Sequence, residues 1–144
     1  MATVLAVCIS KRKGEQKRPV DRVECKIDHG IDGDAHAGNW HRQISLLAKE
    51  SVDKVQQRID FPLKAGDFAE NVLTEGIQLC TLPVGTVLTI GQMRGQVTQI
   101  GKECHASCVI RQKAGDCVMP REGIFIKVIT EGTIQPGDEI TVEQ

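Results

Sequence analysis

Cysteine and histidine side chains are concentrated in one short stretch of this chain. Between positions 104 and 117 lie three of the six cysteines and one of the four histidines: Cys104, His105, Cys108 and Cys117. Thiolates are strong nucleophiles and good ligands for soft metals. We therefore expect this stretch to handle sulfur or a metal, and the rest of the chain to position it.

Two kinds of site fit this stretch. Cys104 and Cys108 have a C-x3-C spacing around His105, and with Cys117 they make a compact zinc site one alternative. Structural zinc sites usually join two such ligand pairs, so little chain is left here to fold around a metal. The other alternative is a reactive thiol, because Gly, Lys, His and Ser surround Cys104 and Cys108. Three further cysteines sit within or beside apolar runs and are expected to be buried hydrophobic side chains: Cys8, Cys25 and Cys80.

A second polar group begins in the glycine-rich stretch Gly33–Gly38. Asp34 and His36 can orient a ligand or accept its protons, and glycine lets the backbone approach a bound group closely. The alternative for this pair is an Asx turn with a surface histidine. Arg42 can form paired hydrogen bonds to phosphate or carboxylate oxygens, and Gln43 can hydrogen-bond to the edge of a heterocycle.

Three other polar segments have both a structural and a functional interpretation. Glu70 and Asn71 are typical of a solvated turn but also supply acidic and amide groups. The basic stretch Lys11–Arg18 holds five cations, which are either solvated surface or a means of attracting an anionic ligand. Arg121 lies in a turn after Cys117 and is a candidate anion contact.

Composition restricts the class of protein. The 144 residues are expected to form one domain, residues 1–144. A net charge of −1, one Trp and no Tyr argue against nucleic-acid binding. No apolar run is long enough to span a membrane, and the run Val4–Ile9 is too short for a signal peptide. We expect a cytoplasmic protein with reduced thiols, in which clustered cysteines are catalytic or metal-binding.

The elements that must position these residues are mostly short strands. Apolar positions at helical spacing predict one amphipathic helix over Leu46–Ile59, and Gly30–Gly38 is expected to be a loop. Phe68–Leu73 is a short strand or a bend, and a five-residue link, Gly91–Gly95, is expected between two of the strands. The predicted strands are Thr3–Ile9, Arg22–Ile27, Thr86–Ile90, Gln96–Ile100, Gly123–Ile129 and Glu139–Val142. This pattern indicates a mainly β fold, a barrel-like closed sheet with one principal amphipathic helix and short helical turns.

Taken in order, these motifs resemble the MOSC domain, found at the C-terminus of molybdenum-cofactor sulfurases. They are most similar to its small stand-alone bacterial members. The shared sequences are the basic loop, G-D-A-H-A-G-x-W-H-R-Q-I-S-L-L-A, F-A-E-N, L-P-V-G-T, C-H-x-x-C and G-D-C-V-M-P-R-E-G. The resemblance extends from about Ile9 to Ile140, nearly the whole chain.

The resemblance implies a MOSC-type β-barrel and one cysteine that carries sulfur as a persulfide or ligates the molybdenum of the pterin cofactor. That cysteine falls at Cys108, which an apolar pair follows as in relatives, or at Cys104. Cys108 is accordingly the expected metal ligand. The residues expected to bind the cofactor match the family's glycine-rich and G/A-E-N motifs or are candidate anion contacts: Asp34, His36, Arg42, Gln43, Glu70, Asn71 and Arg121.

The same resemblance implies a role in sulfuration of the molybdenum cofactor (molybdopterin), with a sulfurtransferase-like activity or an accessory role. The expected partners are a pyridoxal-phosphate-dependent cysteine desulfurase and molybdoenzymes or cofactor-biosynthesis proteins. The chain itself is expected to bind no pyridoxal phosphate. Two alternatives stay open: a non-catalytic carrier of the cofactor, and a small zinc-stabilised barrel that acts through protein contacts.

Overall fold

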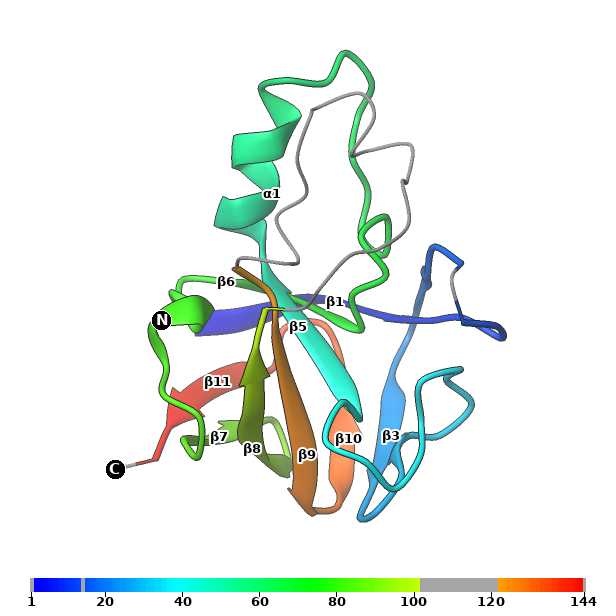
Figure 1. Cartoon of the computed structure of the whole chain (residues 1–144), viewed down its shortest axis with the longest axis vertical. Coiled ribbons are helices and arrows are strands. Elements are labelled where there is room, and N and C mark those ends of the chain that lie inside the picture. The colour runs from blue at the N-terminus through cyan, green and yellow to red at the C-terminus, as the bar shows by residue number, and fades with distance from the viewer. Residues whose placement is uncertain (1, 14, 102–121, 144) are drawn as a thin grey trace.

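The computed structural model describes residues 2–13, 15–101 and 122–143 (Figure 1). The described elements include the α-helix α1 (Lys49–Gln56) and the 3-10 turn η1 (Leu79–Thr81). Its strands are β1 (Ala2–Ile9), β2 (Arg18–Val20), β3 (Val23–Lys26), β4 (Gly30–Ile31), β5 (Ile44–Ala48), β6 (Val72–Glu75), β7 (Val87–Ile90), β8 (Met93–Ile100), β9 (Ile124–Thr130), β10 (Gly132–Ile134) and β11 (Glu139–Val142).

Seven of these strands close into a barrel. Their order is β11-β7-β8-β9-β5-β6-β1, and the ring closes because β1 also pairs with β11. The β5–β6 pair is parallel and the other pairs of the ring are antiparallel. β2 adds an extra strand beside β1, and β10-β3-β4 form a second, smaller sheet. The predicted mainly β, barrel-like fold is confirmed.

Strand β5 joins two hydrophobic cores because its side chains alternate between two covered faces. Ile44, Leu46 and Ala48 point into the main core, which fills the barrel. Leu47 points the other way, into a smaller core that includes Val52 and other residues at and beyond helix α1. All five residues of β5 are buried, and all except Ser45 are apolar, so its sequence does not alternate regularly between polar and apolar residues.

This double burial explains why the predicted helix was too long. The run Leu46–Ala48 belongs to β5, and α1 extends only from Lys49 to Gln56 instead of over Leu46–Ile59. A continuous apolar run is compatible with a strand buried on both faces as well as with a helix. Tertiary pairing of β5 with β6 and β9 decides between them.

The predicted five-residue link between β7 and β8 was also wrong. Ile90 pairs directly with Met93, so the turn is the two residues Gly91 and Gln92, and Gly91 takes a positive φ of 59°. Gly95 lies within β8 and pairs with Leu88 of β7. Glycine suits this position because a Cβ would come within 2.7 Å of the Ile126 side chain. Three short strands escaped prediction: β2, β4 and β10.

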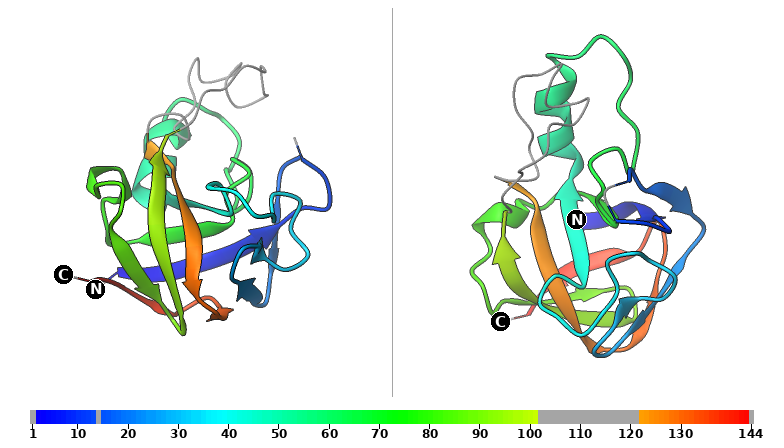
Figure 2. Two further views of the ribbon diagram at one scale, coloured as in Figure 1. Left: turned by 60° about the horizontal axis from the view of Figure 1, so that its bottom comes forward. Right: turned by 45° about the vertical axis from the view of Figure 1, so that its right-hand side comes forward.

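The loops that carry the sequence motifs meet on one side of the barrel. The N-terminal hairpin β1–β2, in blue, and the chain after β4, in cyan, lie on the same side in both views of Figure 2. A backbone hydrogen bond joins them, from Ala35 N–H to Ser10 O at 2.9 Å. A second bond joins the hairpin to the chain after α1, from Lys17 N–H to Gly66 O at 2.9 Å. Within the described residues, no helix has the length and apolar character needed to cross a membrane.

Candidate functional site

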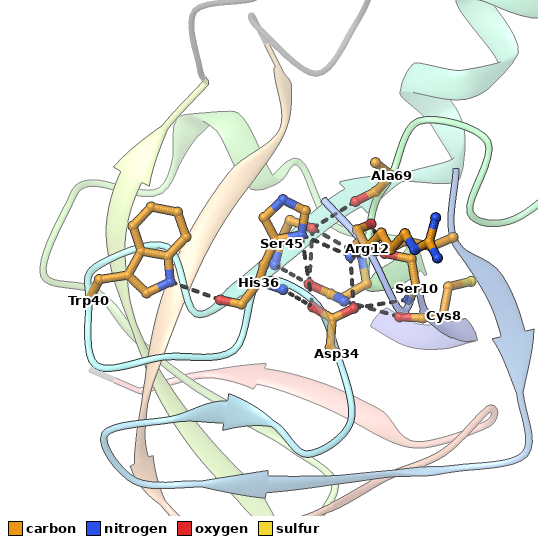
Figure 3. Close-up of polar contacts among 10 residues, drawn as sticks. Cys8, Ser10, Arg12, Asp34, His36, Trp40, Ser45 and Ala69 are labelled. Carbon is orange, nitrogen blue, oxygen red and sulfur yellow. Dashed lines mark hydrogen bonds and ion pairs between the residues drawn. The ribbon is translucent and has the colours of Figure 1, made fainter. Parts of the chain in front are cut away.

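A buried ion pair lies at the centre of the candidate site. Lys17 ends the hairpin loop before β2, and its Nζ lies 2.7 Å from Oδ1 of Asp34, with both side chains fully shielded from solvent. The same Nζ lies 3.1 Å from Ser10 Oγ and 2.9 Å from His36 Nδ1. Figure 3 shows Asp34 between His36 and Ser10. This contact corrects the sequence interpretation of the basic stretch, because Lys17 is neither solvated nor exposed to an approaching ligand.

Asp34 is held as a carboxylate. Burial by itself would raise its pKa, but the hydrogen bond and charge of Lys17 outweigh burial and hold the pKa below its usual range. The backbone N–H of Ser10 also donates to Oδ1, at 3.1 Å. Oδ2 accepts the backbone N–H of His36 at 3.1 Å, which is an Asx-type turn. The turn and the ligand-orienting interpretation of this motif are therefore compatible.

The Asn71 side chain links three strands beside the site through hydrogen bonds and its place in the chain. Its Nδ2 donates to Cys8 O at 3.0 Å, in β1, and its Oδ1 accepts the backbone N–H of Ser45 at 3.0 Å, in β5. Asn71 directly precedes β6, so one buried side chain ties β1, β5 and the start of β6 together. Ala69, two residues earlier, has a positive φ of 63° and accepts the Ser45 hydroxyl through its carbonyl at 3.3 Å. This left-handed conformation is strained for alanine, which has a Cβ, and the strain lies beside the site.

Glu70 is fully buried and closes the turn that supports Lys17. Its carboxylate accepts the backbone N–H groups of Gly66 at 2.8 Å and Phe68 at 3.1 Å. Burial raises the pKa of Glu70 to about 7 despite these hydrogen bonds. Gly66 is pressed against the hairpin, since a Cβ at Gly66 would lie 1.9 Å from the Lys17 carbonyl oxygen. Glu70 therefore orders the turn on which the hairpin rests.

A small, positively charged pocket opens in front of these groups. It holds about 150 Å³, and its lining among the described residues is Lys13, His36, Trp40, Arg42, Ser45, Ala69, Asn71 and Phe125. The Lys13 ammonium lies 5.3 Å from the Trp40 ring centre, and the Arg42 guanidinium lies 5.4 Å from that of Phe125. No carboxylate is among these lining side chains, so the pocket favours an anion.

Arg42 also connects this pocket to the base of the cysteine stretch. Its Nε donates to Gln99 Oε1 at 3.1 Å, and Gln99 Nε2 donates to Gly101 O at 2.7 Å. The N–H of Gly101 in turn donates to Gly123 O at 2.6 Å. Arg42 of the pocket is thus linked through Gln99 to Gly101, the last described residue before position 102.

A wider hollow of about 510 Å³ adjoins the pocket, and Trp40 lines both. Gln43 lines this hollow together with Gln96, and its Oε1 accepts the backbone N–H of Val128 at 2.9 Å. The Trp40 indole N–H donates to the His36 carbonyl at 2.8 Å, as Figure 3 shows, which fixes the ring between the two spaces.

The predicted site residues divide into three groups. His36, Arg42 and Asn71 line the small pocket. Asp34 and Glu70 are buried behind it, and Gln43 lines the wider hollow. Cys104, Cys108, Cys117 and Arg121 lie outside the described residues. The pocket residues that sequence reasoning missed are Trp40, Ser45, Ala69 and Phe125. The sequence signal for Trp40 and Ser45 was their position inside the glycine-rich motif, whereas Phe125 reaches the pocket only through the β5–β9 pairing.

The three cysteines expected to be buried hydrophobic side chains differ from one another. Cys8 and Cys25 are fully buried, and burial raises the pKa of each thiol to about 12, so neither is a reactive thiolate. Cys80 departs from the expectation, because it is half-buried and lines a separate pocket between α1 and η1. Over the ranges that the structure describes, no group of three or more His, Cys, Asp or Glu side chains is arranged to hold a metal ion.

The sequence profile of the MOSC domain matches residues 32–141 of this chain, which is more than half of its length. The chain belongs to the MOSC domain family. No curated protein matches this MOSC protein in a sequence search. The matched range begins just before Asp34 and ends in β11, so it contains both the glycine-rich and the A-E-N motifs.

Solved structures share the fold of this MOSC protein. The YuaD protein of Bacillus subtilis has 19% sequence identity and a TM-score of 0.75, over 99% of this chain and 96% of YuaD. YiiM of Geobacillus stearothermophilus has 20% identity and a TM-score of 0.74, over 100% of this chain and 76% of YiiM. YiiM of Escherichia coli has 18% identity and a TM-score of 0.69, over 100% of this chain and 70% of its own length. At these identities the similarity concerns the fold alone.

Proposed function

We propose that this MOSC protein binds the molybdenum cofactor and carries sulfur on Cys108 or Cys104 for sulfuration of that cofactor. Family membership supports a function related to the molybdenum cofactor. The observation that supports the proposal is the chain of hydrogen bonds from Arg42 through Gln99 to Gly101, because Gly101 precedes Cys104 by only three residues in the sequence.

The donors of the pocket suit the anionic end of the cofactor. Lys13 and Arg42 supply positive charge, while Ser45 and Asn71 add a hydroxyl and an amide. A volume of about 150 Å³ is roughly that of five water molecules, which is enough for a phosphate group but not for a whole pterin cofactor. A guanidinium and an ammonium are the side chains that bind phosphate most readily.

The hollow beside Trp40 suits the remainder of the cofactor. Its volume of about 510 Å³ falls within the usual range of about 300–1,000 Å³ for small-molecule sites. The Trp40 side chain would lie between the phosphate and the pterin ring of the cofactor, because it lines both spaces. Gln43 and Gln96 would offer amide groups to the heterocycle. The bound cofactor would supply a molybdenum centre for which soft sulfur is a suitable ligand.

The sulfur step exchanges one S–S bond for another. The thiolate of Cys108 or Cys104 attacks the terminal sulfur of a persulfide on a cysteine desulfurase. The S–S bond of the donor breaks, the desulfurase cysteine leaves as a thiolate, and the terminal sulfur keeps its proton as Cys–S–SH on this chain. No external oxidant is needed, since the persulfide already carries the oxidised sulfur.

Intact-protein mass spectrometry after incubation with a desulfurase and free cysteine tests this step. We expect the wild type to gain the mass of one sulfur atom, and the Cys104→Ser/Cys108→Ser double variant to gain none. The single variants identify the acceptor, and Cys25→Ser serves as the matched control because Cys25 is buried. An unchanged adduct on the double variant would show that this stretch is not the acceptor.

Analysis of metal and pterin content tests cofactor binding. Protein purified from a host that makes the molybdenum cofactor should carry molybdenum and a fluorescent pterin. Bound pterin without any sulfur adduct would favour the non-catalytic carrier. Stoichiometric zinc in place of pterin would contradict the proposal and favour the zinc-stabilised barrel.

A further inference from the structure

The side-chain amide of Gln99 is fixed in one orientation by its neighbours. Its Oε1 accepts the Nε–H of Arg42 at 3.1 Å, and its Nε2 donates to Gly101 O at 2.7 Å. If the two ends of the amide were exchanged, an N–H would face the N–H of Arg42 and an oxygen would face the carbonyl oxygen of Gly101. Both contacts would be repulsive, so the hydrogen bonds determine which end is the oxygen.

The same oxygen holds a second donor. His41 Nε2 lies 3.0 Å from Gln99 Oε1. Because an amide oxygen can only accept, Nε2 of His41 must carry a proton. Three hydrogen bonds therefore hold the amide of Gln99, which lies in β8, against the residues that precede β5 and against Gly101.

Arg42 is held on two sides by residues of other strands. Gln99 of β8 engages its Nε, and the guanidinium carbon lies 5.4 Å from the centre of the Phe125 ring in β9. Arg42 is partly exposed and lines the small pocket. Among the residues that the structure describes, none forms a hydrogen bond or an ion pair with its two terminal amino groups. The contacts thus fix the guanidinium while leaving its terminal N–H groups for a ligand.

We propose that Gln99 is a positioning residue, which holds Arg42 through Nε so that the two terminal amino groups bind two oxygens of one oxyanion. The ligand class is a phosphate monoester or another anion that offers two oxygens to one guanidinium. The inference rests on the proposed function for the identity of that anion, but the orientation of Arg42 does not.

The expected effect of Gln99 is on affinity, without contact with the ligand. Gln99 is not among the described residues that line the small pocket. A guanidinium that is already fixed loses less conformational freedom when an anion binds. Loss of the Gln99 amide should therefore weaken binding only where an arginine is present to be positioned.

Nitrogen-15 NMR of the arginine side chains tests the orientation without any ligand. In the wild type, the Nε–H of Arg42 should give a separate signal that exchanges slowly with water, because Gln99 accepts this proton. The Arg42→Lys variant assigns the signal by removing it. In Gln99→Met the signal should move to the position of exposed arginines and exchange faster. A rapidly exchanging Nε–H in the wild type, or an unchanged signal in Gln99→Met, would overturn the inference, whatever the fate of the proposed function.

A double-mutant cycle tests the effect on binding. We expect Gln99→Met to weaken the binding of inorganic phosphate by about threefold to tenfold when residue 42 is arginine. Lysine binds phosphate as a point charge that needs no fixed fork, so Gln99→Met should have little effect in the Arg42→Lys background. Gln92→Met is the matched control, because Gln92 is an exposed glutamine in the turn before β8, and it should bind phosphate as the wild type does. Arg42 and Gln99 are both partly exposed, so these variants should fold.

The pattern of these affinities decides the result. Equal losses from Gln99→Met in the two backgrounds, or no loss in either, would overturn the positioning role. Absence of phosphate binding in the wild type would overturn it as well. Cofactor binding and sulfur transfer are judged separately, by the pterin content and by the mass increase described above.

Discussion

The candidate site contains two sets of charged residues that differ in burial and therefore in role. The inner cluster, Lys17 with Asp34, is closed to solvent and its hydrogen bonds are made within the protein. The rim, Lys13 with Arg42, faces a pocket; Lys13 is exposed and Arg42 is partly so. The buried cation Lys17 thus stabilises the site, whereas the solvent-accessible cations Lys13 and Arg42 are expected to bind the ligand.

The energetic consequence follows from solvation. Removing one partner of a buried ion pair leaves a charge without compensation, whereas removing an exposed charge leaves water in its place. Substitutions in the inner cluster should therefore change stability, and substitutions in the rim should change binding. The predictions below test that division, from the largest expected effect to the smallest.

The largest effect is expected from Lys17→Met. Loss of the ammonium leaves the carboxylate of Asp34 buried without its partner, which should lower the free energy of unfolding by about 3–5 kcal/mol. Urea denaturation at neutral pH measures it. Lys13→Met is the matched control in the rim and should cost less than about 1 kcal/mol. The double variant Lys17→Met/Asp34→Asn should regain part of the loss, because no unpaired charge remains.

Equal stability of Lys17→Met and Lys13→Met would contradict the division. It would mean that the ion pair does not hold the hairpin to the loop after β4.

The next effect is expected from Gly66→Ala. The new Cβ would overlap the Lys17 carbonyl oxygen, at a backbone position with a positive φ of 90°. We expect a loss of about 2–4 kcal/mol in the free energy of unfolding. Gly85→Ala is a matched control, because Gly85 has a positive φ of 98° but nothing within 4 Å of the added Cβ. A control as damaging as Gly66→Ala would show that backbone strain alone, and not contact with the hairpin, accounts for the loss.

A smaller, pH-dependent effect is expected from Glu70. Its pKa is raised in the folded state from 4.5 to about 7, so the folded protein retains a proton that the unfolded chain has lost. The contribution of Glu70 is fully present below its unfolded pKa and is lost as pH rises through about 7. Stability should therefore decrease over this window, by about 1–3 kcal/mol.

Glu70→Gln removes this titration. Unfolding free energies measured between pH 4.5 and 7 should become flatter in the variant than in the wild type, even though the variant is less stable at the acidic end. An identical pH dependence in both proteins would show that Glu70 does not titrate in this window.

The sequence predicted most of the barrel and only part of the site. Alternating or β-branched runs such as Thr3–Ile9 and Glu139–Val142 identified strands directly, because half-buried strands have a period of two. Leu46–Ala48 was assigned to the helix because a strand covered on both faces has no such period. The barrel's closure by β1 and β11 depends on pairing between chain ends, which local patterns do not encode.

Within the site, the sequence shows which residues belong to one motif but not which of them are buried. The sequence motif groups Asp34 with His36, and the two are in contact through the His36 backbone N–H. Nothing near Lys17 in the sequence shows that it alone among the basic residues of its stretch is buried. Its burial comes from Gly66, about fifty residues further on, and from Asp34 across the site. Gln43 resembled a ligand-reading side chain, yet its oxygen accepts a backbone N–H of β9.

The most direct test of the account is the pterin content of the rim variant Lys13→Met/Arg42→Gln. Protein should be purified beside the wild type from a host that makes the molybdenum cofactor. We expect the variant to lose bound pterin by about tenfold or more while its unfolding free energy stays within about 1 kcal/mol of the wild type. Wild-type pterin content in the variant, or none in the wild type, would contradict the claim that the rim binds the cofactor.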